Sequence, residues 1–524
     1  MKIKRLKIGH GIYKDVKGRL PIYLTDWVDG MNYRVIPSTI FLYFINLLPA
    51  IAFAQDLFDK TDNTYGLNEI LLSNAIGGIA FGIFAGQPLV IVGVTGPIAI
   101  FNITVYDLVK NKKDCAYFSF IGWTYIWGMI IHFIIAILDG VRFIRYITSY
   151  SCDTFGLFIN CIYIQKGIEI LIEQFEVNGF DVKEENYLAN GFLSIVVSLL
   201  MVIIGVSINL IGNYSNYFSP KIRKLLVDYG TPFCVIFLSG FNHFGGHLKE
   251  VELQRLNTSR SFSPSDNILR NGWIIKFWED ISVSNIFLAI PFGILLTFLF
   301  YFDHNVSSLM CQGIQYPLKK PSSFHWDFFV LGITTGLSAL LGIPAPNGLL
   351  PQAPLHTESL CVGEQDEDGK MLITEVVEQR VTNTAQGLLT LATISNPLLV
   401  VLGLVPQAVL AGLFLIMGLL GVGTNEVGRR IKYCVLEKRF RPPDSVFTKL
   451  SSLKWLHVFI GLELLAFAAE FGITQTKGAI AFPGVLCVFV LVPYCARWVF
   501  PPHDLRLLDG KAVNRFILQN LSSV

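Results

Sequence analysis

Two long apolar segments of this chain are interrupted by glycine and proline. The first interruption spans residues 87–97 and reads QPLVIVGVTGP, and the second spans 342–352 and reads GIPAPNGLLPQ. Within a bilayer every backbone N–H and C=O needs a partner, so such breaks occur only where protein or a polar cavity surrounds them. A matched pair of broken segments in two halves of a chain is typical of a transporter binding site.

The composition is that of a membrane protein with many helical spans. Hydrophobic residues make up 52% of the 524 residues and charged residues 15%, whereas soluble domains are about a quarter charged. The net charge is +2 and no basic tract interleaves with aromatics, so we expect no nucleic-acid partner. The nine cysteines are scattered and form no C-x-x-C, so we expect no metal and no other cofactor.

The predicted fold class is an all-α polytopic membrane protein with about fourteen transmembrane segments. The expected segments are 33–56, 68–86, 87–108, 115–138, 143–173, 190–211, 225–242, 282–312, 325–341, 349–361, 379–402, 406–427, 453–471 and 478–500. Pro97 and Pro351 lie at nearly equal distances from the starts of the two halves, 33–242 and 282–500. Since each half has an odd number of spans, the two seven-span repeats should be inverted.

The distribution of Lys and Arg predicts the orientation. Positive charges gather before the first span and in every second loop, which places the N-terminus in the cytoplasm; the cluster Lys110, Lys112 and Lys113 is an exception. The acidic loop 174–189 and the long loop 243–281 would then face outward. The latter contains the glycosylation sequon Asn257-Thr258-Ser259.

Several motifs resemble the bicarbonate and anion-exchanger transporter family. The run 41–54 (FLYFINLLPAIAFA), followed by Gly86-Gln87-Pro88-Leu89 and Gly96-Pro97, is similar to the first spans of that family. The stretch 303–308 (DHNVSS) resembles its acidic eighth-span motif, and 344–357 (PAPNGLLPQAPLHT) is similar to the borate exporters of fungi and plants. The animal chloride/bicarbonate exchangers carry an arginine where Gln352 aligns.

The resemblance implies a division into units. A core unit would comprise 33–138 and 282–402, and a gate unit 139–242 and 403–500. Around them lie a cytoplasmic N-terminal segment (1–32), an extracellular loop (243–281) and a cytoplasmic tail (501–524) that could rest on membrane lipid. The resemblance further implies alternating access, a homodimer joined through the gate unit and, most simply, a place in the plasma membrane, with an internal membrane such as the vacuolar one as the alternative.

The two breaks supply the candidate binding residues. Half-helices beginning near Gly96 and Leu350 should point their N-termini at each other, and each terminus offers unpaired N–H groups and about half a positive charge. Such a pair can hold an anion without Lys or Arg. The candidate substrate-binding residues are Gln87, Thr95, Gly96, Asn347, Gly348 and Gln352. For Thr95, Gln87 and Gln352 the alternative is capping or bracing of the backbone.

Asp303 is the candidate coupling or gating residue. Ionisable side chains at membrane depth are costly and functional by default, and a buried carboxyl can exchange a proton during a transport cycle. The alternative is a structural acceptor bonded to Asn305 or to backbone amides. His304 points to another face of the helix, where packing explains it. Glu463 and Glu470 should lie in the gate unit, in a vestibule or at a subunit contact.

The sequence therefore predicts a secondary transporter that exports borate or boric acid. The nearest alternative is a bicarbonate or chloride exchanger of the same fold, and a proton-coupled nucleobase transporter would share the architecture. The chain has no H-E-x-x-H, no G-x-S-x-G and no nucleotide-binding loop, so we expect no enzyme. A passive channel, the direction of transport, the coupling ion and the choice between borate anion and neutral boric acid stay open at this stage.

Overall fold

The computed structural model describes residues 8–112, 115–175, 187–215, 217–251, 253–256, 261–265, 270, 272–365, 371–443, 445–476 and 478–510. The sequon at 257–259, much of the acidic loop 174–189, and the tail after residue 510 lie outside these residues. The first half contains α3 (Val35–Lys60), α4 (Leu67–Phe84), β1 (Val92–Gly93), α5 (Gly96–Val109), α6 (Tyr117–Ile137), α7 (Ser149–Glu173), α8 (Tyr187–Tyr214) and α9 (Pro220–Ser239).

The second half repeats a long helix, a shorter helix and a break before its remaining helices. It contains α10 (Val283–Cys311), α11 (His325–Leu341), β2 (Asn347–Gly348), α12 (Gln352–Ser359), β3 (Cys361–Gln365), β4 (Met371–Val376), α13 (Val381–Thr393), α14 (Asn396–Leu402), α15 (Gln407–Thr424), α16 (Glu426–Val435), α17 (Leu453–Thr474), α18 (Phe482–Phe489), α19 (Val492–Ala496) and α20 (Pro502–Leu508). The β3–β4 hairpin is an antiparallel addition within the helical fold that the periodicity did not predict.

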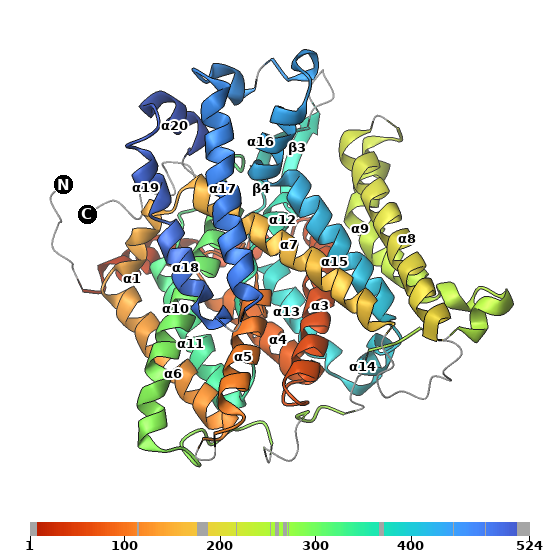
Figure 1. Ribbon diagram of the computed structural model, residues 1–524, viewed down its shortest axis with the longest axis vertical. Helices are drawn as coiled ribbons and strands as arrows, with labels where there is room; N and C mark the ends of the chain where they lie inside the picture. The colour runs from red at the N-terminus through yellow and green to blue at the C-terminus, as the bar shows by residue number, and fades with distance from the viewer. Residues whose placement is uncertain are drawn as a thin grey trace.

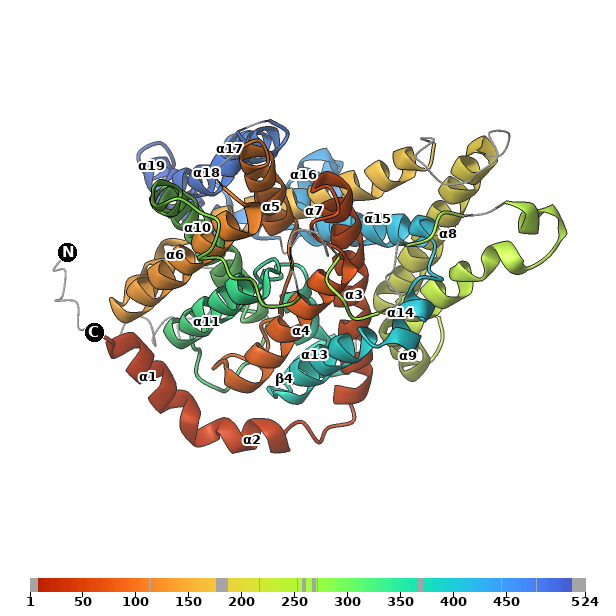
Figure 2. The ribbon, with the colours of Figure 1, turned by 90° about the horizontal axis from the view of Figure 1, so that it is seen from below.

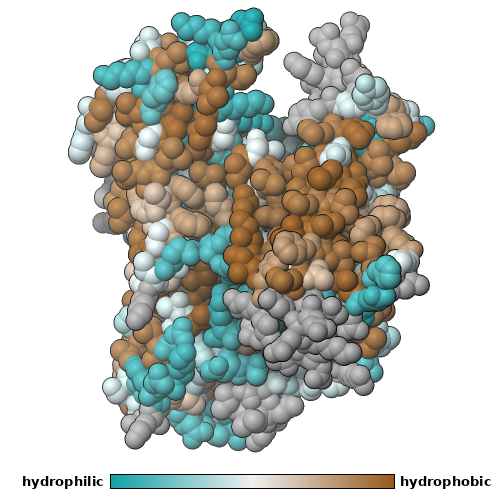
Figure 3. Space-filling model, turned by 45° about the vertical axis from the view of Figure 1, so that its right-hand side comes forward, coloured by the Kyte–Doolittle hydropathy of each residue, from teal (hydrophilic) through white to brown (hydrophobic). Residues whose placement is uncertain are grey.

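Nine helices in the described residues are long and apolar enough to cross a membrane, or ten if the bent pair α13–α14 is one span. Helices α5 and α11 are apolar but shorter, and α12 has eight residues, as expected beside broken segments. The count of about fourteen and the inverted repeat stay predictions. Hydrophobic side chains cover the middle of the face in Figure 3 and hydrophilic ones gather mostly toward its ends.

By their contacts the helices fall into two groups, and α8 and α9 of the second group lie side by side at the right of Figure 1. In the first group, α4 packs on α13 and α3, and α6 packs on α10 and α11. In the second group, α7 packs on α15 and α17, and α8 packs on α9 and α15. The helices named in the first group lie within 33–138 and 282–402, and those named in the second lie within 139–242 and 403–500. The division into a core unit and a gate unit stays a prediction.

The N-terminal helices α1 (His10–Arg19) and α2 (Tyr23–Val28) run along the edge of the first group (Figure 2). Asp15 Oδ2 accepts the backbone N–H groups of Phe324, His325 and Trp326 at 2.7–3.1 Å, which satisfies donors at the start of α11. The sequence suggested a short cytoplasmic segment, and the structure shows helices tied to the first group by a buried carboxylate.

A buried ion pair fastens helix α2 of the same N-terminal segment to the first group. Asp26, which is fully buried, accepts from Arg380 Nε at 3.0 Å and from Lys320 Nζ at 2.6 Å. The other end of the Arg380 side chain donates to the carbonyls of Gly82, Ile83 and Ala85 at the end of α4. One arginine therefore caps a helix and pairs with the N-terminal segment, so loss of either partner would leave a buried charge.

The crossing of α4 and α13 depends on glycines. A Cβ atom on Gly387 would lie 2.7 Å from the backbone nitrogen of Ile79 and 2.9 Å from the carbonyl carbon of Gly78. These are backbone atoms and cannot rotate away. The two helices can approach this closely only because the position carries no side chain.

Gly387→Ala should therefore destabilise the protein, because one methyl group must push two packed helices apart. Overpacking of this kind costs roughly 1–3 kcal/mol, and we expect a clearly lower melting temperature for the detergent-solubilised protein. Gly461→Ala in α17 is the matched control, since nothing lies within 4 Å of its Cβ. Equal melting temperatures for the two variants would show that the close contact is not needed.

Candidate functional site

The two broken segments meet and pair with each other. Val92 lies opposite Gly348 and Gly93 opposite Asn347 in the two-residue antiparallel ladder of β1 and β2. Beside this ladder, the N–H of Leu349 donates to the carbonyl of Ile91 at 2.8 Å. The pairing satisfies backbone groups that a broken span leaves free, and it places the starts of α5 and α12 next to one another.

Side chains satisfy other exposed backbone groups of the breaks. Asp327, buried at the start of α11, accepts from the N–H of Gly86 at 2.6 Å and of Gln87 at 3.0 Å. The further bonds are Asn383 Nδ2 to Pro88 O and Val90 O, His356 Nδ1 to Leu89 O, Val94 N to Asn74 Oδ1, Ser73 Oγ to Pro344 O, and Ala345 N to Tyr125 Oη. Extended backbone at membrane depth is thus enclosed by protein, as the bilayer requires.

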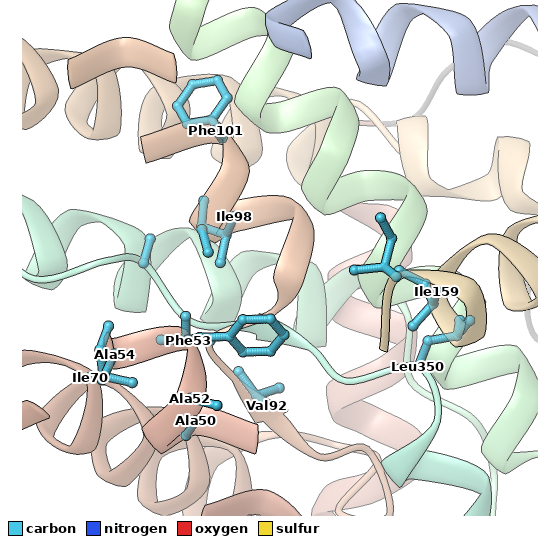
Figure 4. Packing of buried hydrophobic residues seen from close by; sticks show 14 of the residues in the cluster. Ala50, Ala52, Phe53, Ala54, Ile70, Val92, Ile98, Phe101, Ile159 and Leu350 are labelled. Atoms are coloured by element: carbon cyan, nitrogen blue, oxygen red, sulfur yellow. The ribbon is translucent and has the colours of Figure 1, made fainter. Parts of the chain in front are cut away.

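A small cavity lies where the half-helices begin. In the part of the chain that the structure describes, its lining contains no lysine or arginine; it consists of Thr95, Gly96, Pro97, Ile159, Tyr163, Asp303, Gly348, Leu349, Leu350 and Pro351. In Figure 4 the side chains of Ile159 and Leu350 lie beside each other, and the ring of Phe53 is seen between Ile98 and Val92. Two helix N-termini therefore border one cavity.

The two helix starts resemble each other chemically. Thr95 is the N-cap of α5, and its hydroxyl accepts from the N–H of Ile98 at 3.4 Å. Pro97 follows in the first turn of α5, and Pro351 precedes α12. Proline fits the start of a helix because its missing N–H would have no partner there. The remaining N–H groups and the two helix dipoles favour negative charge in the cavity.

Asp303 of α10 is only 2% exposed and faces this cavity. Its Oδ2 accepts from Asn347 Nδ2 at 3.1 Å, and the Thr95 side chain lies near the same carboxylate. Its Oδ1 has no hydrogen bond of standard geometry within the described chain. The Asn305 amide instead donates to the carbonyl of Tyr301, so a structural bond between Asp303 and Asn305 is absent among the described residues.

Gly348 allows β2 to lie directly on α10. A Cβ there would be 2.7 Å from the Cα of His304 and 3.1 Å from the Oγ of Ser307. Ser307 lies one helical turn after Asp303, so its hydroxyl and the carboxyl share a face of α10. The ring of His304 meets that of Phe81 edge to face, with centroids 5.2 Å apart, which agrees with the expected packing role.

Gln352 lies at the start of α12, fully buried. Its Nε2 donates to the phenol oxygen of Tyr163 at 3.3 Å and to the carbonyl of Ile45 at 3.4 Å. Its Oε1 has no partner in the described residues. Gln352 is not part of the cavity lining and reaches the cavity through Tyr163, which is.

The structure gathers most of the expected site residues. The cavity lining includes Thr95, Gly96, Gly348 and Asp303. Asn347 is outside the lining and donates a hydrogen bond to Asp303. Gln87 lies in the extended stretch away from the lining, where its Oε1 accepts from the N–H of Leu89 at 3.4 Å. This contact corresponds to the bracing alternative, and ligand contact by Gln87 has no support in the geometry.

Sequence reasoning missed Tyr163, Ile159 and Ser307. Tyr163 and Ile159 lie one turn apart on α7, within an apolar span where either could equally face lipid. Ser307 belongs to the 303–308 motif, so its spacing from Asp303 was the available signal. Elsewhere the described residues contain no group of three or more His, Cys, Asp or Glu side chains that could hold a metal.

A second buried charge cluster lies in the other helix group. Arg430 of α16 pairs with Asp153 of α7 at 3.1 Å and with Glu463 of α17, and it also donates to the carbonyl of Leu508. All three charged side chains are largely buried. Glu463 therefore holds α16 and α17 together, and this contact accounts for it without a role in a vestibule. Arg430 is thus an internal ion-pair partner of both carboxylates.

The chain matches the model of the HCO3− transporter integral membrane domain over residues 7–190 and 179–513. It belongs to that family. The resemblance inferred from the motifs is thereby confirmed, and with it the integral-membrane, mostly helical fold class and a transport role.

Boron transporter 1 of Saccharomyces cerevisiae is 50% identical over 516 residues, which cover 98% of this chain and 87% of that protein. Band 3 anion transport protein of Rattus norvegicus is 26% identical over 524 residues, covering 96% of this chain and 55% of that protein. The solved transmembrane domain of the cyanobacterial bicarbonate transporter BicA has the same fold, with a TM-score of 0.52 at 12% identity, covering 84% of this chain and 98% of that one.

Proposed function

We propose that this protein is a secondary active transporter that exports borate by alternating access. The similarity to the yeast boron transporter along nearly the whole chain carries the proposal. The cavity supports it: two helix N-termini supply positive potential, and the hydroxyls of Thr95 and Tyr163 and the carboxyl of Asp303 contribute polar groups to a lining that is otherwise formed by Gly, Pro, Ile and Leu. Tetrahydroxyborate has one negative charge and four hydroxyls that both donate and accept, so it suits such a lining better than a bare ion does.

A bicarbonate or chloride exchanger remains the second candidate, because Band 3 anion transport protein is similar in sequence along nearly the whole chain. The residue at position 352 argues against it. The animal exchangers carry an arginine where Gln352 aligns, and here the described cavity lining has no cation to replace it. A glutamine offers both a donor and an acceptor, which matches a hydroxylated ligand.

The proposed moving parts are the two helix groups. The core unit (33–138 and 282–402) contains both half-helices and Asp303, and the N-terminal helices α1 and α2 are attached to it. The gate unit (139–242 and 403–500) contains Tyr163 and Ile159. A cavity lined by both units can open to either side when one unit moves against the other. We further propose a homodimer through the gate unit, in the plasma membrane, with both termini in the cytoplasm as the Lys and Arg distribution predicts.

Asp303 is the proposed coupling residue. An ionised carboxylate and an anion in one dry cavity repel each other strongly, whereas a protonated carboxyl can donate a hydrogen bond to the anion. Asp303 Oδ1 has no hydrogen bond of standard geometry within the described chain and would take this role. Anion binding should therefore favour proton binding at Asp303, which links transport to pH.

The substrate assignment is tested in cells and in vesicles. Cells expressing the protein should contain less boron and grow at higher boric acid concentrations than cells with an empty vector, with boron measured by elemental mass spectrometry. Reconstituted protein should likewise release boron from vesicles. Unchanged boron content together with robust chloride/bicarbonate exchange would assign the protein to the second candidate.

Asp303→Asn tests the coupling role, because it keeps the size and hydrogen-bonding capacity but removes the titratable charge. The variant should fold and insert normally, and boron transport in vesicles should be lost or should no longer respond to a pH gradient. Normal melting behaviour with normal, pH-responsive transport would refute the role, and failure to fold would favour the structural alternative.

Alternating access can be tested at an ion pair that joins the proposed units. Lys166 of α7 lies 3.0 Å from Asp56 of α3, and both side chains are nearly buried. Asp56→Cys combined with Lys166→Cys, linked by a short thiol crosslinker, should stop boron transport, and reduction should restore it. The reason is that α3 and α7 must separate if the units move past each other.

The control is a crosslink inside one unit. Asp107 and Lys110 form an ion pair within the α5 region at 2.5 Å, and a crosslink between cysteines at these positions should leave transport intact. Mass spectrometry verifies both crosslinks. Full transport by the fully linked 56–166 protein would show that α3 and α7 do not move apart, which contradicts the proposed mechanism.

A further inference from the structure

The gate side of the cavity offers one hydrogen-bonding side chain, Tyr163. It is 3% exposed and lines the cavity from α7. Its ring packs against Phe414 at 5.5 Å and against Phe53 at 6.3 Å between centroids. The phenol is therefore held in place by aromatic neighbours from α15 and α3, and its hydroxyl is directed by packing.

The hydroxyl of Tyr163 and the amide of Gln352 leave a donor and an acceptor unused. The phenol oxygen accepts the Gln352 N–H, but in the described part of the chain no acceptor is recorded for the phenol proton. The Gln352 Oε1 likewise accepts nothing there, although the residue is fully buried. Leaving such buried groups unpaired is unfavourable, so a ligand that pairs with both binds more tightly.

We propose that Tyr163 is a ligand-binding residue on the gate side and that, with Gln352, it selects anions that carry hydroxyl groups. This inference rests on the proposed function and names the selectivity element of that site. The phenol O–H donates to one borate oxygen. Gln352 lies behind Tyr163, outside the described cavity lining, so another borate hydroxyl donates to Gln352 Oε1 once the ligand has displaced the hydrogen bond between the two side chains. Chloride has no proton to donate, so it would leave the Gln352 oxygen unpaired and pay the cost.

The hydrogen bond between Gln352 and Tyr163 also connects the two proposed units. Gln352 belongs to α12 and Tyr163 to α7, so their hydrogen bond joins the two helix groups across the cavity. At 3.3 Å it is longer than the common N–H···O distance of about 2.9–3.0 Å, and a ligand hydroxyl between the two groups can replace it. The bound ligand would then bridge the two units.

Tyr163→Phe tests the inference because it removes the hydroxyl and keeps the ring. In proteoliposomes the borate concentration giving half-maximal boron transport should rise roughly ten- to hundredfold, as expected for one lost hydrogen bond to a charged ligand. The maximal rate at saturating borate should change little, because the ring packing that a purely structural role needs is retained. The chloride concentration that gives half-maximal inhibition of boron transport should not be higher for the variant than for the wild type.

The matched control is Tyr43→Phe. Tyr43 also lies in a long apolar helix, α3, and its hydroxyl forms a 2.6 Å hydrogen bond with the hydroxyl of Thr393. Neither residue lines the cavity. This variant should keep the wild-type borate dependence. Tyr163 and Gln352 are hydrogen-bonded to each other, so their effects should not be additive. The loss of apparent borate affinity in the double variant Tyr163→Phe/Gln352→Met should be smaller than the sum of the losses in the two single variants.

The outcomes separate the inference from the function on which it rests. If the wild-type protein moves no boron, the proposed function is wrong. If the wild type moves boron and the half-maximal borate concentration of Tyr163→Phe stays within about twofold of the wild-type value, the selectivity role is overturned. The same conclusion follows if Tyr43→Phe raises this concentration as much as Tyr163→Phe does. Should Tyr163→Phe fail to fold, Gln352→Met breaks the same pair from the other side, and an unchanged borate dependence in that folded variant also overturns the inference.

Discussion

The need to pair every backbone polar group inside a membrane determines how this molecule is built. Two stretches of extended chain lie at its centre, and each exposes carbonyl and N–H groups that lipid cannot satisfy. They satisfy part of this need by pairing with each other at Val92–Gly93 and Asn347–Gly348. Buried side chains such as Asp327 and Asn383 supply further partners. The helices around the breaks must therefore carry polar residues, and these are what hold the site in position.

Close packing is the second requirement, and it follows from the first. A two-residue ladder can be enclosed only if the surrounding helices approach its backbone. Gly348 brings β2 against α10, and Gly387 brings α13 against α4, at distances that exclude a Cβ. The backbone beside the cavity is therefore closely packed, and the carboxyl of Asp303 accepts a hydrogen bond from Asn347. Close packing of this kind can hold side chains in a fixed geometry around a ligand.

The sequence predicted the parts of this arrangement that depend on local chemistry. Glycine and proline mark the breaks, so the approximate starts of α5 and α12, and the meeting of Thr95 with Gly348, followed from residue types and matched positions. Tyr163 and Arg430 could not be placed in the same way. A tyrosine in an apolar helix looks the same whether it faces lipid, a neighbour or a cavity. An arginine at a loop boundary looks like a cytoplasmic charge even when Asp153 and Glu463 surround it. The β3–β4 hairpin was missed because its short strands lie between segments that read as helical.

The proposed anion site has no lysine or arginine in its described lining, and its positive potential would come from the helix N-termini instead. Two helix N-termini contribute roughly one positive charge in total, spread over N–H groups that cannot move with the ligand. A lysine or arginine would bind an anion more tightly but would also hold it, and a transporter must release what it binds. Asp303 works in the opposite direction, because an ionised carboxylate lowers the positive potential that the dipoles create. In the proposed mechanism, loss of its proton would weaken anion binding when release is needed, and a single carboxyl beside Thr95 and Asn347 would then link affinity to pH.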